Sequence, residues 1–218
     1  MALGSSGGQV YNTRFIWRVC LVAAMGGLLF GYDWVVIGGA KPFYEKYFEL
    51  RTSVQIGWAM SSALVGCLVG AVLSGMLSDQ FGRKRLLILA GLLFTISAIG
   101  TGLTGSYNAF VAYRLLGGIG IGLASSLSPM YIAEISPAEM RGRFVSINQL
   151  TIVIGILAAQ IVNWQIAQPV PEGASAELIR ASWNGQFGWR WMFGAETLPA
   201  ALFFVMMFFV PESPRWLI

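Results

Sequence analysis

Histidine is absent from this sequence of 218 residues, and cysteine occurs only twice, as Cys20 and Cys67. Without histidine, the usual base of Ser-His-Asp and Cys-His hydrolases and the commonest ligand of transition metals are missing. Both cysteines lie inside apolar runs, which indicates packing residues rather than a disulfide or a metal site. No nucleophile–base pair or metal cluster is visible, so we predict a protein that is not an enzyme and needs no cofactor.

Charged residues are also scarce, at 11% of the chain, whereas a soluble domain carries about a quarter. Hydrophobic residues make up 56%, which excludes a disordered chain and argues against a soluble one. Since a transmembrane helix uses roughly 20 residues, the apolar material suffices for about six spans in a lipid bilayer. The net charge of +4 comes from basic residues clustered between apolar runs, a pattern of membrane orientation rather than of nucleic-acid binding.

Six apolar stretches carry few or no charges. They are 15–40, 52–78, 86–113, 115–133, 144–171 and 191–210. The sequence Gly105-Ser106-Tyr107-Asn108 divides the third stretch by a tight turn, so that the fourth span includes Arg114. An even number of spans places both termini on one side, and the excess of basic residues favours the cytoplasm for that side.

Small residues follow one face of the second span. They recur at every fourth position, as Ser62, Gly66, Gly70, Ser74 and Ser78, and Gly118 and Gly122 repeat the spacing on the fourth span. Such stripes let helix backbones approach closely, and the spacing fits fixed packing and a sliding surface equally well. The glycines from Gly117 to Gly122 do not predict a nucleotide site, because position 123 is leucine and no strand precedes them.

Three spans each carry one charged residue, Asp33, Arg114 and Glu196. Counted from assumed span ends at Lys41, Asn108 and Arg190, all three lie on the order of 10 Å below the outer surface. In the alternative interpretation each charge is near enough to a span end to snorkel, which suits the long side chain of Arg114, but Asp and Glu have short side chains and snorkel poorly. Because two carboxylates share one guanidinium, desolvation and repulsion favour a proton on one of them. We predict that Asp33 is the titrating coupling site, Arg114 its electrostatic switch and Glu196 a modulator.

Two charged loops separate spans on the predicted cytoplasmic side. The first, residues 75–85, contains a glycine turn with an acid and bases at the adjoining helix ends. In the second, Ser136, Pro137 and Glu139 form a capping-box pattern that predicts a helix start.

These loops and several other motifs carry a resemblance to a known family. The motifs are Gly75 to Arg85, Arg114-Leu115-Leu116-Gly117-Gly118, Pro129-Met130-Tyr131-Ile132-Ala133-Glu134, Arg141-Gly142-Arg143, Asn148-Gln149, Gly188-Trp189-Arg190 and Pro211-Glu212-Ser213-Pro214-Arg215. The first is similar to a signature loop of the major facilitator superfamily, and the other six in order are highly specific: the chain resembles the sugar porter family of that superfamily. Its pattern is most similar to bacterial proton–xylose porters and animal facilitative glucose porters.

The resemblance implies an all-α membrane fold of twelve helices in two halves, each an inverted 3+3 repeat. This chain would be the N-terminal half, with a flexible cytoplasmic N-terminus at 1–14, a six-helix bundle at 15–211 and the start of a central cytoplasmic segment at 212–218. Its expected partners are a monosaccharide, a proton, the lipid bilayer of the cell membrane and the missing C-terminal half. Its expected activity is proton-coupled sugar symport, with a facilitative uniporter or a non-transporting sugar sensor as alternatives.

The resemblance also implies roles for individual residues. Asp33 matches the acid that is the proton site of proton-coupled members, while Phe30 and Gln149 match sugar contacts. Ile156 stands where xylose porters carry glutamine and animal glucose porters isoleucine, which favours a hexose. The inner gate of the family is an ionic network. It maps here to Asp79, Gly82, Arg83, Glu134, Arg141, Glu212 and Arg215.

Overall fold

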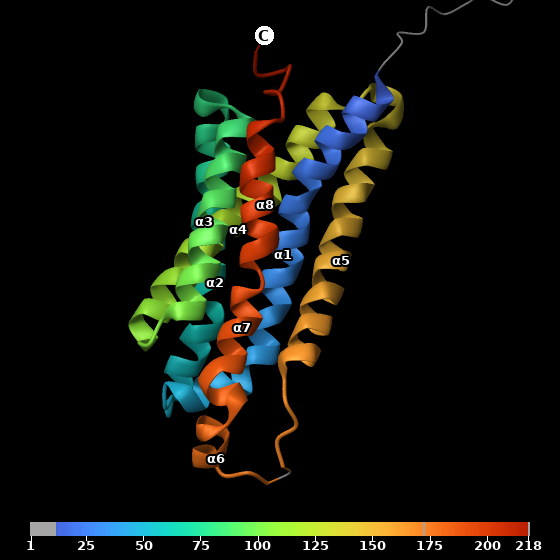
Figure 1. The fold of residues 1–218 in the computed structure, drawn as a ribbon. Helices are drawn as coiled ribbons and strands as arrows, with labels where there is room; N and C mark the ends of the chain where they lie inside the picture. Colours follow the sequence, from blue (N-terminus) through green and yellow to red (C-terminus); the bar gives the residue numbers. More distant parts are fainter. Residues whose placement is uncertain (1–11, 172, 218) are drawn as a thin grey trace, which may run out of the picture.

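The computed structural model describes residues 12–171 and 173–217, which form a bundle of helices with no strand in those ranges (Figure 1). The predicted flexible N-terminus falls largely on residues 1–11, outside the described residues. The helices are α1 (Thr13–Tyr47), α2 (Ser53–Phe81), α3 (Arg83–Leu103), α4 (Tyr107–Ile135), η1 (Ala138–Met140), α5 (Arg141–Ile166), α6 (Ala176–Ala181), η2 (Asn184–Gly188), α7 (Trp189–Gly194) and α8 (Thr197–Phe208).

Within the described ranges, six helical segments are long and apolar enough to cross a membrane, as the sequence predicted. The first four are α1 to α4, the fifth combines η1 and α5, and the sixth combines η2, α7 and α8. The start of α1 and the end of the described chain lie together at the end of the bundle opposite α6 (Figure 1). We call these the terminal end and the α6 end.

The first helix is longer than predicted. A charge at Lys41 suggested an end near residue 40, but α1 continues through Pro42 to Tyr47. Beyond the apolar stretch, Lys41 and Glu45 form an ion pair of 3.7 Å along the helix surface. Charges therefore mark where the apolar stretch ends, whereas the helix continues for nearly two further turns.

The stripe of small residues is the contact between α2 and α4. Its members on α2 are buried. A Cβ atom on Gly70 would collide with the backbone of Ile119, and one on Gly118 with the backbone of Ala63. The two helices thus touch backbone to backbone, which confirms the packing role of the stripe.

We expect Gly70→Ala to destabilise the bundle by about 1–3 kcal/mol, because the added methyl group meets rigid backbone atoms rather than a movable side chain. Gly75→Ala on the same helix is the matched control, since a Cβ there has no neighbour within 4 Å. Thermal unfolding in detergent compares the two variants with the wild type. Equal melting temperatures for Gly70→Ala and Gly75→Ala would contradict the close contact.

The predicted capping box at Ser136 is wrong. The Ser136 hydroxyl donates instead to the Ile132 carbonyl of α4 at 2.6 Å, and the residue ends that helix. A 3-10 turn, η1, follows, and α5 begins only at Arg141. The pattern of Ser136, Pro137 and Glu139 correctly predicted a junction between two helices. It did not predict the capping, because the Ser136 hydroxyl bonds to a carbonyl of the preceding helix instead of an N–H group of the following one.

Candidate functional site

A buried ion pair joins the first and fourth spans. The Asp33 carboxylate of α1 accepts a hydrogen bond from the Arg114 guanidinium of α4, and the residues are 4% and 2% exposed. Arg114 also lies over the Phe193 ring, 5.3 Å from its centroid. The arginine therefore points into the bundle and does not snorkel to the surface.

Glu196 completes the cluster. It lies where the sixth span is interrupted between α7 and α8, is 3% exposed, and is an electrostatic neighbour of both Asp33 and Arg114. Its Oε1 atom and the Nε atom of Arg114 have no hydrogen-bond partner among the described residues. The structure thus brings together all three charges that the sequence placed at one depth. Two acids and one base share a buried site, an arrangement typical of proton relays in membrane proteins.

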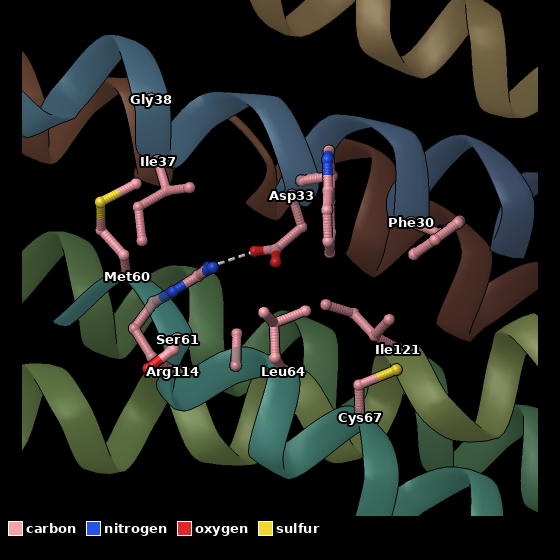
Figure 2. A pocket seen from close by; sticks show the side chains of 12 residues that line it. Phe30, Asp33, Ile37, Gly38, Met60, Ser61, Leu64, Cys67, Arg114 and Ile121 are labelled. Atoms are coloured by element: carbon pink, nitrogen blue, oxygen red, sulfur yellow. Dashed lines mark hydrogen bonds and ion pairs between the residues drawn. The ribbon is translucent and has the colours of Figure 1, made fainter. Parts of the chain in front are cut away.

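The ion pair forms part of the wall of a pocket of about 280 Å³, the α1/α2/α4 pocket (Figure 2). Apart from Asp33 and Arg114, the side chains around it are mainly apolar. They include Phe30, Trp34, Met60, Leu64, Cys67 and Ile121. Most of these residues carry no motif that predicts a site role, although positions 60, 64 and 67 recur at helical spacing along one face of α2.

A second pocket, of about 270 Å³, lies between α1, α4 and α5 and is called the α1/α4/α5 pocket. It is lined by Gly27, Phe30, Ser125, Pro129, Val145, Asn148, Gln149 and Ile152. The structure therefore places Phe30 and Gln149 around one space, and Phe30 lines both pockets. Ile156 is half-buried, with its backbone beside Gly31 of α1, and does not line this pocket.

At the terminal end, Arg83 stands between two acids. Its guanidinium lies 3.2 Å from the carboxylates of both Asp79 and Glu134, and it also donates to the Ser78 carbonyl at 3.0 Å. The Asp79 side chain is 80% exposed, whereas that of Glu134 is 8% exposed. Glu134 is thus the shielded partner, and its ion pair ties α3 to α4.

Glu212 contributes to this end by a different kind of bond. Its Oε1 atom accepts hydrogen bonds from the backbone N–H groups of Lys84 at 3.0 Å and Ser213 at 2.9 Å. Because Lys84 lies in the first turn of α3, the carboxylate caps the start of that helix. Gly82, at φ 84°, leaves room for it, because a Cβ there would lie 2.6 Å from Glu212 Oε2. The Ser213 hydroxyl donates to Glu134, a link that the sequence did not suggest.

The two remaining arginines of the expected network form no ion pair within the described ranges. Arg141 donates through Nε to the Ala133 carbonyl at 2.9 Å, which joins the start of α5 to the end of α4. Arg215 is exposed. Of the expected network, Asp79, Arg83 and Glu134 are therefore joined by ion pairs. Glu212 is connected to them through the Lys84 backbone N–H and through Ser213, whose hydroxyl bonds to Glu134.

Comparison with known proteins places this geometry in a family. A family model described as sugar (and other) transporter matches residues 19–218. The D-xylose-proton symporter of Escherichia coli (strain K12) is 42% identical over 232 residues, covering 95% of this chain and 45% of that protein. The glucose transport protein of Synechocystis is 46% identical over 208 residues, covering 95% and 43%.

Comparison with solved structures gives the same family. The proton:xylose symporter XylE bound to 6-bromo-6-deoxy-D-glucose superimposes with a TM-score of 0.84 at 41% identity, covering 95% of this chain and 47% of that one. The chain thus spans about half the length of the relatives it matches. It belongs to the sugar transporter family of the major facilitator superfamily.

Proposed function

We propose that this chain is the N-terminal half of a proton-coupled monosaccharide symporter that works by alternating access. The buried cluster of Asp33, Arg114 and Glu196 carries this proposal, because a facilitator has no need to bury two acids and a base together. The family membership supports it, and so do the names of relatives that couple xylose or arabinose to protons.

The proton acts by exchanging the partner of Arg114. While Asp33 is charged, its carboxylate holds the guanidinium. A proton on Asp33 removes that attraction and leaves Glu196 as the neighbouring carboxylate, with its Oε1 atom free to accept. Because Asp33 is on α1, Arg114 on α4 and Glu196 at the break in the sixth span, the exchange connects three helices. Such a two-state element is what alternating access requires.

The sugar binds beside this cluster. Phe30 offers an apolar face to a pyranose ring and Gln149 an amide that donates to and accepts from hydroxyls. We propose a hexose as the substrate. Ile156 lies outside the α1/α4/α5 pocket, so the support is the family pattern alone, in which animal glucose porters carry isoleucine at this position and xylose porters carry glutamine.

Transport by the full-length protein in proteoliposomes tests the function. We expect counterflow of radiolabelled glucose and competition by galactose. Transport of xylose but of neither hexose would contradict the substrate assignment, and sugar binding without flux would indicate the sensor instead.

The ion pairs of the terminal end form the inner gate, and we place this end in the cytoplasm. Eight basic residues lie at it, namely Arg14, Arg18, Arg83, Lys84, Arg85, Arg141, Arg143 and Arg215, against five towards the other end. The protein is a multi-pass membrane protein, and we propose the plasma membrane as its location.

Glu134→Lys is expected to raise the inward-open population at least about tenfold, which corresponds to about 1.4 kcal/mol. The new ammonium group would repel Arg83, the present partner of Glu134. The population is measured in the full-length protein as the rate at which an impermeant thiol reagent reaches Cys67 from the cytoplasmic side. Glu139→Lys, an exposed reversal at the same end, is the control. Equal rates in the two variants would refute the gate.

A further inference from the structure

Asn148 is a nearly buried amide without a partner. It is 4% exposed, lines the α1/α4/α5 pocket, and its side chain makes no hydrogen bond within the described ranges. Its Oδ1 atom is enclosed against Gly27. An unsatisfied buried amide costs about 1–3 kcal/mol, and native proteins seldom retain one without a reason. A ligand that both donates and accepts hydrogen bonds would remove this cost.

Ser125, on the facing wall, offers further acceptors. Pro129 lies inside α4 and has no N–H, so the Ser125 carbonyl four residues earlier lacks its usual helical donor. The Ser125 hydroxyl donates to the Gly122 carbonyl at 3.2 Å, which leaves its own lone pairs free. Two helices therefore place residues with unused polar groups around one pocket.

The chemistry of this wall selects a class of ligand. The lining contains amide, hydroxyl and aromatic groups but no charged residue, so an ion would gain no counter-charge there. Hydroxyl groups donate and accept at the same atom, and a ring of carbon atoms packs on the Phe30 face. A polyhydroxylated neutral ring satisfies all of these groups together.

We infer that Asn148 is a further sugar-binding residue that determines specificity, with Ser125 beside it, in addition to Gln149. This assignment rests on the proposed function, since it takes the ligand of the pocket to be the transported monosaccharide. It adds a site that discriminates between sugars by a single hydroxyl, because a sugar lacking that hydroxyl leaves the amide unpaired.

Binding of glucose and of the set of monodeoxyglucoses to the purified full-length protein tests the inference. We expect the wild type to bind at least one deoxyglucose about tenfold more weakly than glucose. In Asn148→Ala, glucose binding weakens by a similar factor, and the difference between glucose and that deoxyglucose disappears. A residue with a purely structural role would weaken all the sugars alike and leave their ratios unchanged.

Asn163→Ala is the matched control. Asn163 lies on the same helix, is also buried with an unpartnered Oδ1 atom, and has its amide nitrogen 3.5 Å from the Val36 carbonyl, outside the pocket. This variant should keep the wild-type ratios. Unchanged ratios in Asn148→Ala would overturn the inference alone, whereas a wild type that binds no monosaccharide would overturn the proposed function as well.

A second variant, Asn148→Leu, separates a loss of sugar binding from a loss of folding, because leucine has a similar shape and no polar atoms in its side chain. We expect its melting temperature to equal or exceed that of the wild type while glucose binding falls at least about tenfold, the signature of a polar group kept for a ligand. A lower melting temperature with unchanged sugar ratios would assign Asn148 to structure.

Discussion

Asp33→Asn is expected to abolish sugar accumulation in full-length proteoliposomes with an imposed pH gradient. One pH unit is worth about 1.4 kcal/mol, so one-to-one coupling in the wild type drives accumulation towards about tenfold. Asparagine cannot exchange a proton, so the internal sugar concentration of the variant should only equal the external one. Counterflow of sugar should persist, because the pocket lined by Gln149 is unchanged.

The control for this experiment is Glu49→Gln. Glu49 also forms an ion pair with an arginine, Arg180, but both side chains are about half exposed at the α6 end. Exposed pairs contribute little, and this one is remote from the cluster, so accumulation should stay at the wild-type level. Uphill, pH-driven uptake by Asp33→Asn would remove Asp33 from the coupling mechanism.

The second large effect concerns folding. Arg114→Leu is expected to destabilise the protein by about 3–5 kcal/mol, because it leaves Asp33 charged, buried and without its partner. The double variant Asp33→Asn with Arg114→Leu should recover most of this loss, since neither residue then carries a charge. Thermal unfolding followed by tryptophan fluorescence measures both.

Arg180→Leu is the matched comparison, because it breaks the exposed pair with Glu49 and should cost less than about 1 kcal/mol. If Arg114→Leu were no less stable than Arg180→Leu, or if the double variant were as unstable as Arg114→Leu, the Asp33–Arg114 pair would not be a buried pair whose two charges depend on each other.

The spans could be predicted because lipid imposes a simple rule on sequence, namely about 20 apolar residues between charges. The same rule misplaced the end of α1, since it detects the apolar stretch and not the hydrogen-bonded helix that continues to Tyr47. It also gave no sign of the π-helical turn at 184–188 or of the break at Glu196. Those features depend on how backbone hydrogen bonds shift locally, which hydropathy does not record.

The buried cluster could be predicted from the sequence because charged residues within spans are rare and usually lie next to a partner of opposite charge. Counting residues from Lys41 and Asn108 predicts a common depth for Asp33 and Arg114, and the structure joins the two side chains although α1 continues beyond Lys41. The cap that Glu212 forms on α3 was not predicted, since a sequence shows a carboxylate but not a distant backbone N–H. The role inferred for Asn148 could not be predicted either, because a sequence does not show that a buried amide oxygen lacks a hydrogen-bond partner.

Proton movement during sugar entry tests the central claim most directly. Glucose is added to full-length proteoliposomes in a weakly buffered medium, and the external pH is recorded together with glucose uptake. Symport predicts that the medium becomes alkaline as glucose enters, and that Asp33→Asn abolishes the pH change. Glucose entry without any change in external pH would contradict coupling and identify a facilitator in which Asp33 is a vestige.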